Sequence, residues 1–139
     1  MDKKTVPNGV LLEEAAVLLG EGREVVLNPR GSSMLPFIHE GRDSVVLRLK
    51  DDVQVGDIVL ARLTDRYVLH RVFAIEGDRL TLMGDGNVGL KEFCGKEDIL
   101  GTVVAIQRGS KTIIPGKARL WKALLPVRRY ILAIYRRLI

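Results

Sequence analysis

Short runs rich in apolar and β-branched residues, such as Val25-Val26-Leu27 and Ile58-Val59-Leu60, make up most of the chain between residues 24 and 114. Such runs are typical of strands, and turn-forming dipeptides such as Asn28-Pro29 and Gly77-Asp78 separate them. The expected strands cover residues 24–27, 44–49, 57–63, 66–75, 79–83, 99–107 and 111–114. Many short strands at this spacing favour a mainly β fold, an antiparallel sandwich or partly open barrel, over a parallel sheet.

Helical spacing of apolar residues is found towards the two ends of the chain. Near the N-terminus it predicts a helix over about residues 11–19, which Gly20 and Gly22 end. Near the C-terminus it predicts an amphipathic helix with arginines on its other side, broken or kinked near Pro126. The apolar stripe of this second helix consists of Leu120, Leu124, Val127, Ile131, Ile134 and Leu138.

Length and charge divide the chain into a body and a tail. At 139 residues, 47% of them hydrophobic, the chain can bury one core, so residues 1–116 are expected to form one β domain with its N-terminal helix. Residues 117–139 contain seven basic and no acidic residues, whereas the rest of the chain carries 15 basic against 17 acidic. This basic tail can dock on the domain or attach to anionic lipid. Nucleic-acid binding is not expected, because no recognised nucleic-acid-binding module accompanies the charge.

The sequence also indicates where the protein works. The single cysteine, Cys94, excludes an intramolecular disulfide and is expected to be a small, partly buried side chain. The first residues lack the apolar core of a signal peptide, and no run approaches the ~20 apolar residues of a membrane-spanning helix. We therefore expect a cytoplasmic protein, with peripheral attachment at the inner face of the membrane as a further role of the tail.

Three separate blocks of sequence supply a hydroxyl, an imidazole and a carboxylate, which are the parts of a serine hydrolase. They are Ser33 in Gly31-Ser32-Ser33-Met34-Leu35-Pro36, His70 in His70-Arg71-Val72, and Asp85 in Gly84-Asp85-Gly86-Asn87. If Gly77-Asp78 is a two-residue hairpin loop, a continuous register places His70 opposite Asp85. The register therefore predicts a contact between His70 and Asp85, which a β-bulge would remove.

Each of these residues also has a purely structural interpretation. Ser33 and Asp85 are common turn residues, and His70 alternates with valines on one face of an apolar strand. Arg71 is expected to face away from His70, and His39 to lie at the surface. Glu92 and Asp98 are alternatives to Asp85 as the carboxylate that orients His70.

Taken together, the blocks resemble the peptidase superfamily that joins type I signal peptidases to LexA-type self-cleaving repressors. The resemblance covers about residues 30–87 and includes Gly56-Asp57-Ile58-Val59. Bacterial signal peptidases and LexA-type proteins have lysine where this chain has His70, so the likeness is to the Ser-His branch of archaeal and endoplasmic-reticulum signal peptidases. No segment resembles the membrane anchor of signal peptidases or the DNA-binding domain of the repressors.

The resemblance implies a role for each matching residue. Ser33 would be the nucleophile, His70 the general base and Asp85 the group that orients His70. Gly31 stands where bacterial signal peptidases often carry an oxyanion-donating serine, which leaves Ser32 and the backbone near Met34 as expected oxyanion or substrate contacts. A second acidic residue often found after the Gly-Asp-Asn block is missing from its usual place. No metal or cofactor is expected.

The leading hypothesis is a serine endopeptidase that cleaves a leader or signal-like peptide with a Ser-His(-Asp) mechanism. An exposed strand edge beside Ser33 would let the peptide pair as an added strand. The same fold could instead serve as a non-catalytic peptide-binding or regulatory module, or as a self-cleaving regulator. The segment before Ser33 contains no Ala-Gly bond like the self-cleavage site of the repressors.

Overall fold

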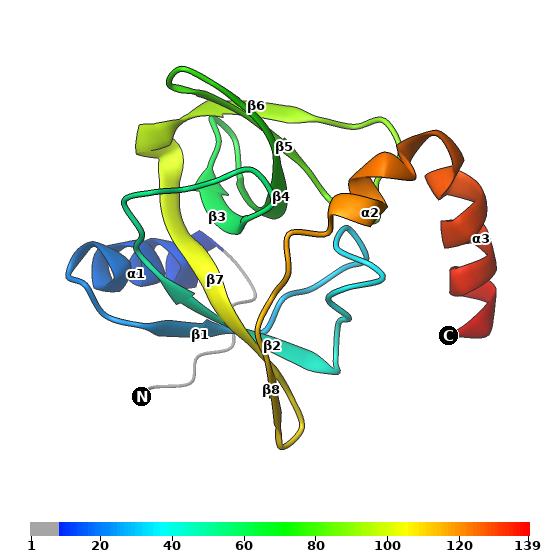
Figure 1. The fold of residues 1–139 in the computed structure, drawn as a ribbon. Coiled ribbons are helices and arrows are strands. Elements are labelled where there is room, and N and C mark those ends of the chain that lie inside the picture. Colours follow the sequence, from blue (N-terminus) through cyan, green and yellow to red (C-terminus); the bar gives the residue numbers. More distant parts are fainter. Residues whose placement is uncertain (1–8) are drawn as a thin grey trace.

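A computed structural model describes residues 9–139, and it consists of one curled antiparallel sheet with a helix at each end of the chain (Figure 1). The helix at the N-terminal end is α1 (Gly9–Gly20). The strands are β1 (Val25–Leu27), β2 (Asp43–Arg48), β3 (Ile58–Arg62), β4 (Tyr67–Glu76), β5 (Arg79–Met83), β6 (Glu92–Gly95), β7 (Ile99–Arg108) and β8 (Lys111–Ile113). A short 3-10 turn, η1 (Lys96–Asp98), precedes β7.

The strands lie in the order β1-β2-β7-β3-β4-β5-β6, with β8 paired to β7, and every pair is antiparallel. The long strand β7 pairs with β2 along one part and with β3 along another, which helps the sheet to close on itself. The predicted mainly β, antiparallel fold is confirmed. Strand β6 was not expected from the sequence because Glu92–Gly95 contains no run of apolar residues and lies between Lys91 and Lys96.

Apolar side chains fill the two faces of the curled sheet separately. One cluster joins α1 to β1, β2, β3 and β7 and includes Leu19, Leu47 and Val103. The other lies between β3, β4 and β5 and includes Val59, Val72 and Leu82. Because residues of a strand point alternately to its two faces, one continuous sheet can serve both clusters.

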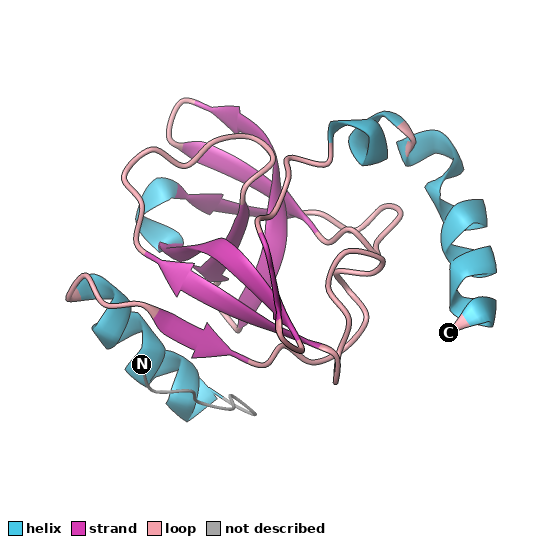
Figure 2. Ribbon diagram, turned by 60° about the horizontal axis from the view of Figure 1, so that its bottom comes forward, coloured by secondary structure: helices cyan, strands magenta, loops and turns pink. Residues whose placement is uncertain are grey.

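The C-terminal tail breaks into α2 (Arg119–Ala123), the 3-10 turn η2 (Leu125–Val127) and α3 (Arg128–Leu138). The break falls at Pro126, as the sequence predicted. In Figure 2 this tail lies beside the loops of the β domain, on the side away from α1. No helix within residues 9–139 has the length and apolar character needed to cross a bilayer.

The tail docks on the domain through only part of its predicted apolar stripe, since Leu124 and Ile131 pack against the docked cluster but remain partly exposed. Trp121, Arg128 and Leu132 are buried, and Trp121 and Leu132 pack against Leu35. The stripe residues Leu120, Val127, Ile134 and Leu138 are exposed. Helical spacing identified an apolar stripe but did not predict which side of the helices the domain covers. That side is set by the burial of Trp121 and Arg128, which do not belong to the stripe.

Candidate active site

Ser33 lies in the turn-rich loop between β1 and β2. The side chains of the next two residues, Met34 and Leu35, are buried in two different apolar clusters. Met34 is buried in the cluster beneath α1, together with Ile38. Leu35 is buried in the cluster of the tail, against Trp121 and Leu132. Consecutive side chains that enter different clusters leave the backbone at Ser33 little freedom to rotate, so the hydroxyl is held by packing.

His70 lies on β4 and is hydrogen-bonded to Glu92 of β6. His70 Nδ1 and Glu92 Oε1 are 2.7 Å apart, and both side chains are buried. A carboxylate only accepts hydrogen bonds, so Nδ1 carries the hydrogen and Nε2 is left as an acceptor. The second oxygen, Glu92 Oε2, makes no hydrogen bond within residues 9–139 and lies 3.6 Å from Arg66 Nη2. Glu92 is thus placed to orient the imidazole and to stabilise its protonated form.

The turn from Gly84 to Asn87 packs directly against Ser33. The Gly86 N–H donates to the Ser33 carbonyl at 2.8 Å, and the Asn87 N–H closes the turn on the Gly84 carbonyl at 3.0 Å. A Cβ built on Gly84 would lie 2.4 Å from the Ser33 carbonyl oxygen and 3.2 Å from His70 Cδ2. A Cβ on Gly86 would lie 2.3 Å from the Ser32 carbonyl oxygen. Only glycine lets this turn approach the Ser33 backbone so closely.

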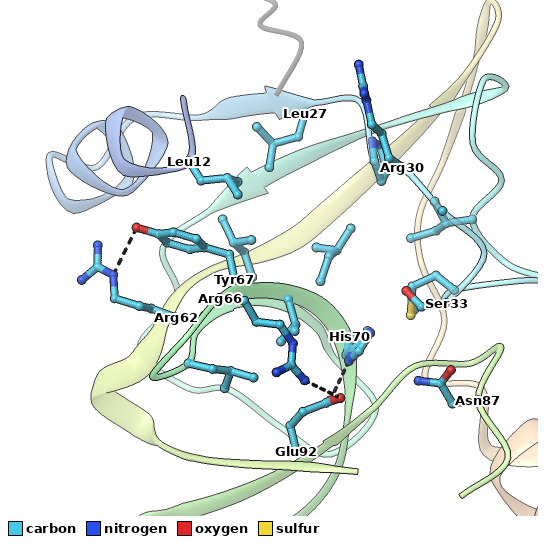
Figure 3. Close-up of a pocket in the computed structure, with 18 of the residues that line it drawn as sticks. Leu12, Leu27, Arg30, Ser33, Arg62, Arg66, Tyr67, His70, Asn87 and Glu92 are labelled. Carbon is cyan, nitrogen blue, oxygen red and sulfur yellow. Dashed lines mark hydrogen bonds and ion pairs between the residues drawn. The ribbon is translucent and has the colours of Figure 1, made fainter. Parts of the chain in front are cut away.

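One pocket of about 880 Å³ brings these elements together. Ser33, His70, Asn87 and Glu92 lie around one end of it, and Figure 3 shows Ser33 and Asn87 on the side of His70 away from Glu92. Ser33 Oγ makes no hydrogen bond within residues 9–139, to His70 or to any other group. Contacts between a nucleophile and its base are often long in the absence of substrate and tighten on binding.

The predicted contact between His70 and Asp85 is wrong. A bulge between Val72 and Ala74 shifts the hairpin register, so that Met83 faces Arg71 instead of Val72. Asp85 accepts hydrogen bonds from Arg71 at 2.7 to 3.1 Å. Of the carboxylates that the sequence left open, Glu92 contacts His70, and Asp98 instead accepts from the Gly95 N–H.

Arg71 faces away from His70, as expected from strand alternation, and its guanidinium is fully occupied. Besides Asp85, it donates to the carbonyls of Gly56 and Gly116 at 2.9 and 2.8 Å. It also lies over the Phe37 ring at 5.2 Å. This buried pair joins β4, the Asp85 turn and the start of the tail, which is a structural role.

Three N–H groups without acceptors lie close to Ser33. Within residues 9–139 nothing accepts a hydrogen bond from the backbone N–H of Ser33 or of Met34. Asn87 Nδ2 is buried without a partner in the same part of the chain, and it would lie 2.8 Å from a Cβ on Gly84. Buried donors without partners are rare in folded proteins, and they often mark a place that a ligand occupies.

The other predicted contacts of the site have different environments. Gly31 and Ser32 are exposed, and Gly31 has a φ of 86°, which favours glycine. The Met34 side chain points into the core, where its sulfur accepts the Asp85 N–H at 3.4 Å. His39 is half-buried, not fully exposed as expected, and its ring contacts the Glu40 carbonyl at 2.9 Å.

Side chains of the tail donate hydrogen bonds to three successive backbone carbonyls of the Gly84–Asn87 turn. Trp121 Nε1 donates to the Asp85 carbonyl at 2.9 Å, Arg136 to that of Gly86 at 3.1 Å and Arg128 to that of Asn87 at 3.2 Å. Burial lowers the pKa of Arg128, which also donates to the Trp121 carbonyl. The tail is therefore part of the scaffold of the candidate site.

A second ion pair anchors the far end of the Ser33 loop. Burial alone would raise the pKa of Asp43, but hydrogen bonds from Arg108, Arg42 and the His39 N–H outweigh it and lower the pKa to about 2. Arg108 also donates to the Phe37 carbonyl at 3.3 Å. The end of the loop that leads into β2 is thus held by a buried ion pair.

The remaining titratable groups give no sign of metal or thiol chemistry. Burial and the nearby carboxylates of Asp98, Glu97 and Glu92 raise the pKa of the Cys94 thiol to about 11, so it stays protonated. Among residues 9–139, no group of three or more histidine, cysteine, aspartate or glutamate side chains has the arrangement of a metal site.

Comparison with known proteins shows the family of this chain. Residues 5–104 match the family model described as Peptidase S24-like, which is most of the chain. The chain belongs to the S24-like peptidase family. It is also 32% identical over 89 residues to the LexA repressor of Pelotomaculum thermopropionicum, a match that covers 64% of this chain and 43% of the repressor. The chain thus spans less than half of that relative's length, and the matching family region ends before the basic tail.

Two residues of the site were not singled out by the sequence. Glu92 was one of several open alternatives, because its approach to His70 depends on the undetected strand β6. Asn87 was read only as part of the Gly84–Asn87 motif. A signal for Asn87 was present, however, since the motif departs from Gly-Asp-Asn by one inserted glycine.

Proposed function

We propose that this protein is a serine endopeptidase that uses Ser33 as nucleophile, His70 as general base and Glu92 as the orienting carboxylate. The observation that carries the proposal is the buried His70–Glu92 hydrogen bond of 2.7 Å in the pocket that Ser33 also lines. Membership in a peptidase family supports the reaction class. Asp85, proposed from the sequence for the orienting role, instead stabilises the turn through Arg71.

The reaction would proceed through an acyl-enzyme. As the Ser33 Oγ–carbon bond forms, His70 Nε2 takes the hydroxyl proton, and Glu92 stabilises the resulting imidazolium. His70 then gives this proton to the leaving amine as the peptide C–N bond breaks. A water molecule repeats the sequence on the ester: His70 takes its proton, its oxygen bonds the acyl carbon, and Ser33 leaves with the proton.

The oxyanion of each tetrahedral intermediate would be held by the free donors around Ser33. The backbone N–H groups of Ser33 and Met34 have no other acceptor in the described chain. We assign the third donor to Asn87 Nδ2, which is buried, unpartnered and on the same side of His70 as Ser33 in Figure 3. An asparagine here compensates for Gly31, which has no side chain to donate.

The groove suits an extended, largely apolar peptide. Besides the catalytic groups, it is lined by aliphatic side chains such as Leu12, Leu27 and Leu69, with charged ones such as Arg30, Arg62 and Asp65 among them. Strand β1 is at the edge of the sheet, and its last residue, Leu27, lines the same pocket together with residues 28–31 that follow it. A substrate strand could pair with this edge and carry its cleaved bond to Ser33. A leader or signal-like peptide has the required character.

Within the superfamily, His70 favours the Ser-His branch of archaeal and endoplasmic-reticulum type signal peptidases. The histidine is buried next to a carboxylate, an arrangement that serves a histidine base. The acidic residue missing from its usual place after the Gly-Asp-Asn block is supplied by Glu92, five residues beyond Asn87.

The direct test is active-site labelling. The purified protein is treated with a peptidyl phosphonate ester, and the labelled residue is mapped by mass spectrometry. We expect one label, on Ser33, that disappears in Ser33→Ala and is strongly slowed in His70→Ala. The matched control is Ser110→Ala, which removes an exposed serine from the turn between β7 and β8. Absence of labelling in the folded wild-type protein would contradict catalysis and favour a binding module.

A second measurement separates cleavage of other chains from self-cleavage, the alternative that the repressor relative favours. The protein is incubated alone and with a mixture of unstructured peptides, and both are examined by intact-mass spectrometry. We expect peptide fragments that depend on Ser33 and an unchanged protein mass. Ser33-dependent shortening of the protein itself, at a rate independent of its concentration, would show a self-cleaving regulator instead.

A further inference from the structure

The exposed face of the tail combines apolar side chains with unpaired positive charge. Ile134 is 63% exposed and Leu138 is 80% exposed, whereas Leu132, on the docked side of the same helix, is 1% exposed. Val127 and Tyr130 continue this stripe, at helical spacing from Ile134. We call Val127, Tyr130, Ile134 and Leu138 the outer stripe. An exposed apolar row of this kind marks an interaction surface.

The orientation of α3 is fixed by its contacts with the domain. Arg128 and Arg136 donate to carbonyls of the Gly84–Asn87 turn, and Leu132 packs against Leu35. These residues lie on one side of the helix, so the outer stripe is turned towards solvent by the same contacts. The stripe can therefore receive a partner without any rearrangement of the candidate active site.

Charge distinguishes among the possible partners. The tail has seven basic and no acidic residues, and within residues 9–139 only Lys117 among them pairs with a carboxylate, that of Asp57. Two copies of such a helix would repel each other. Nucleic acid would satisfy the arginines but would leave the outer stripe in water. An anionic lipid surface satisfies both, because headgroups neutralise the arginines and the acyl boundary takes up the apolar side chains.

We infer that the outer stripe, together with the exposed basic residues Arg119 and Arg137 of the same tail, binds an anionic membrane surface. The helix lies flat in the interface with Ile134 and Leu138 in the acyl boundary. Tyr130 lies at the level of the headgroups, where amphipathic aromatic rings are favoured. The peptidase domain is thereby held at the membrane, where peptides with an apolar leader also gather. This inference concerns the tail and does not depend on the proposed catalytic activity.

Vesicle co-sedimentation of the full chain tests it. We expect binding to vesicles of phosphatidylglycerol and phosphatidylcholine in equal parts, little binding to phosphatidylcholine alone, and weaker binding at high salt. Arg119→Gln together with Arg137→Gln should lower the affinity about 25-fold, and Ile134→Asp by at least as much. Both variants change exposed residues, and the emission of the buried Trp121, the single tryptophan, checks that the tail stays docked.

Matched controls lie outside the tail. Ile114→Asp changes an exposed apolar residue and Lys111→Gln an exposed basic one, and both should bind vesicles like the wild type. Ser33→Ala should also bind normally, so failure of the catalytic proposal and failure of this one can be told apart. Equal binding to neutral vesicles, unchanged binding of the tail variants, or a dimer in sedimentation velocity that Ile134→Asp dissociates would overturn the inference.

Discussion

His70 and Arg71 are neighbours on β4, and each is paired with a buried carboxylate, but the two pairs are built differently. His70 shares one hydrogen bond with Glu92, and the second oxygen of Glu92 makes no hydrogen bond in the described chain. Arg71 is bound to both oxygens of Asp85 and to two backbone carbonyls. In the first pair, Nε2 of His70 is available at the pocket. In the second pair, every guanidinium nitrogen of Arg71 and both carboxylate oxygens of Asp85 already make hydrogen bonds.

One strand thus presents an imidazole with an available nitrogen on one face and a buried, paired guanidinium on the other. A group that transfers protons needs an unsatisfied atom and access to a reactant. A buried charged group that holds turns and tail together needs a partner for its charge, since a buried charge without partners destabilises the fold. The two carboxylates should therefore respond in opposite ways to substitution.

The largest effect is expected for Glu92→Gln. The amide keeps the shape of the side chain but cannot stabilise an imidazolium, so the peptide cleavage rate should fall by about 10³–10⁴-fold. The free energy of unfolding, measured in urea, should change much less. If cleavage were unaffected while Asp85→Asn abolished it in a folded protein, the roles that we give the two carboxylates would be reversed.

Asp85→Ala should act mainly on stability. Removal of the carboxylate leaves the Arg71 guanidinium buried without its charge partner, and breaking such a pair costs about 3–5 kcal/mol. Urea unfolding monitored by Trp121 fluorescence measures the loss. The double variant Asp85→Leu with Arg71→Met should recover part of the stability, because it buries no unpaired charge. A fully stable Asp85→Ala protein would contradict the structural role.

Asn87→Ala tests the proposed oxyanion donor near Ser33. Loss of one oxyanion donor should lower kcat by about 10²–10³-fold and leave KM nearly unchanged. The adjacent Val88→Ala, which changes an exposed side chain, serves as control. A change in KM alone would mean that Asn87 binds the substrate without contacting the developing charge.

The smallest effect concerns Asp43, another supporting carboxylate. Its pKa is lowered from 3.8 to about 2 in the folded protein. The ionised carboxylate therefore contributes about 2 kcal/mol of stability above pH 4, which is lost as the pH falls through the folded-state pKa. Urea unfolding from pH 7 to pH 2 should show this loss in the wild type and a smaller pH dependence in Asp43→Asn. An identical pH dependence in both proteins would exclude the contribution of Asp43.

The sequence predicted most of the fold because the signals are local. Short apolar runs and turn residues identified every strand except β6, with ends within a residue or two of the observed ones. Pro126 indicated the break in the tail. The hairpin register was right near its turn, where Ile75 faces Leu80, and wrong beyond the bulge at Phe73. A bulge arises from strand twist and packing, which the spacing of residues does not record.

The sequence by itself determined the antiparallel strands, the helices near the two ends of the chain, and the three blocks that contain the serine, the histidine and the acidic side chains. These follow from periodicity and residue type, which depend on near neighbours. Only the tertiary structure decided that Glu92 meets His70, that Asp85 meets Arg71, and which face of the tail is covered. Such pairings join strands and turns far apart along the chain, and one shifted residue in a ladder or a helix face exchanges the partners.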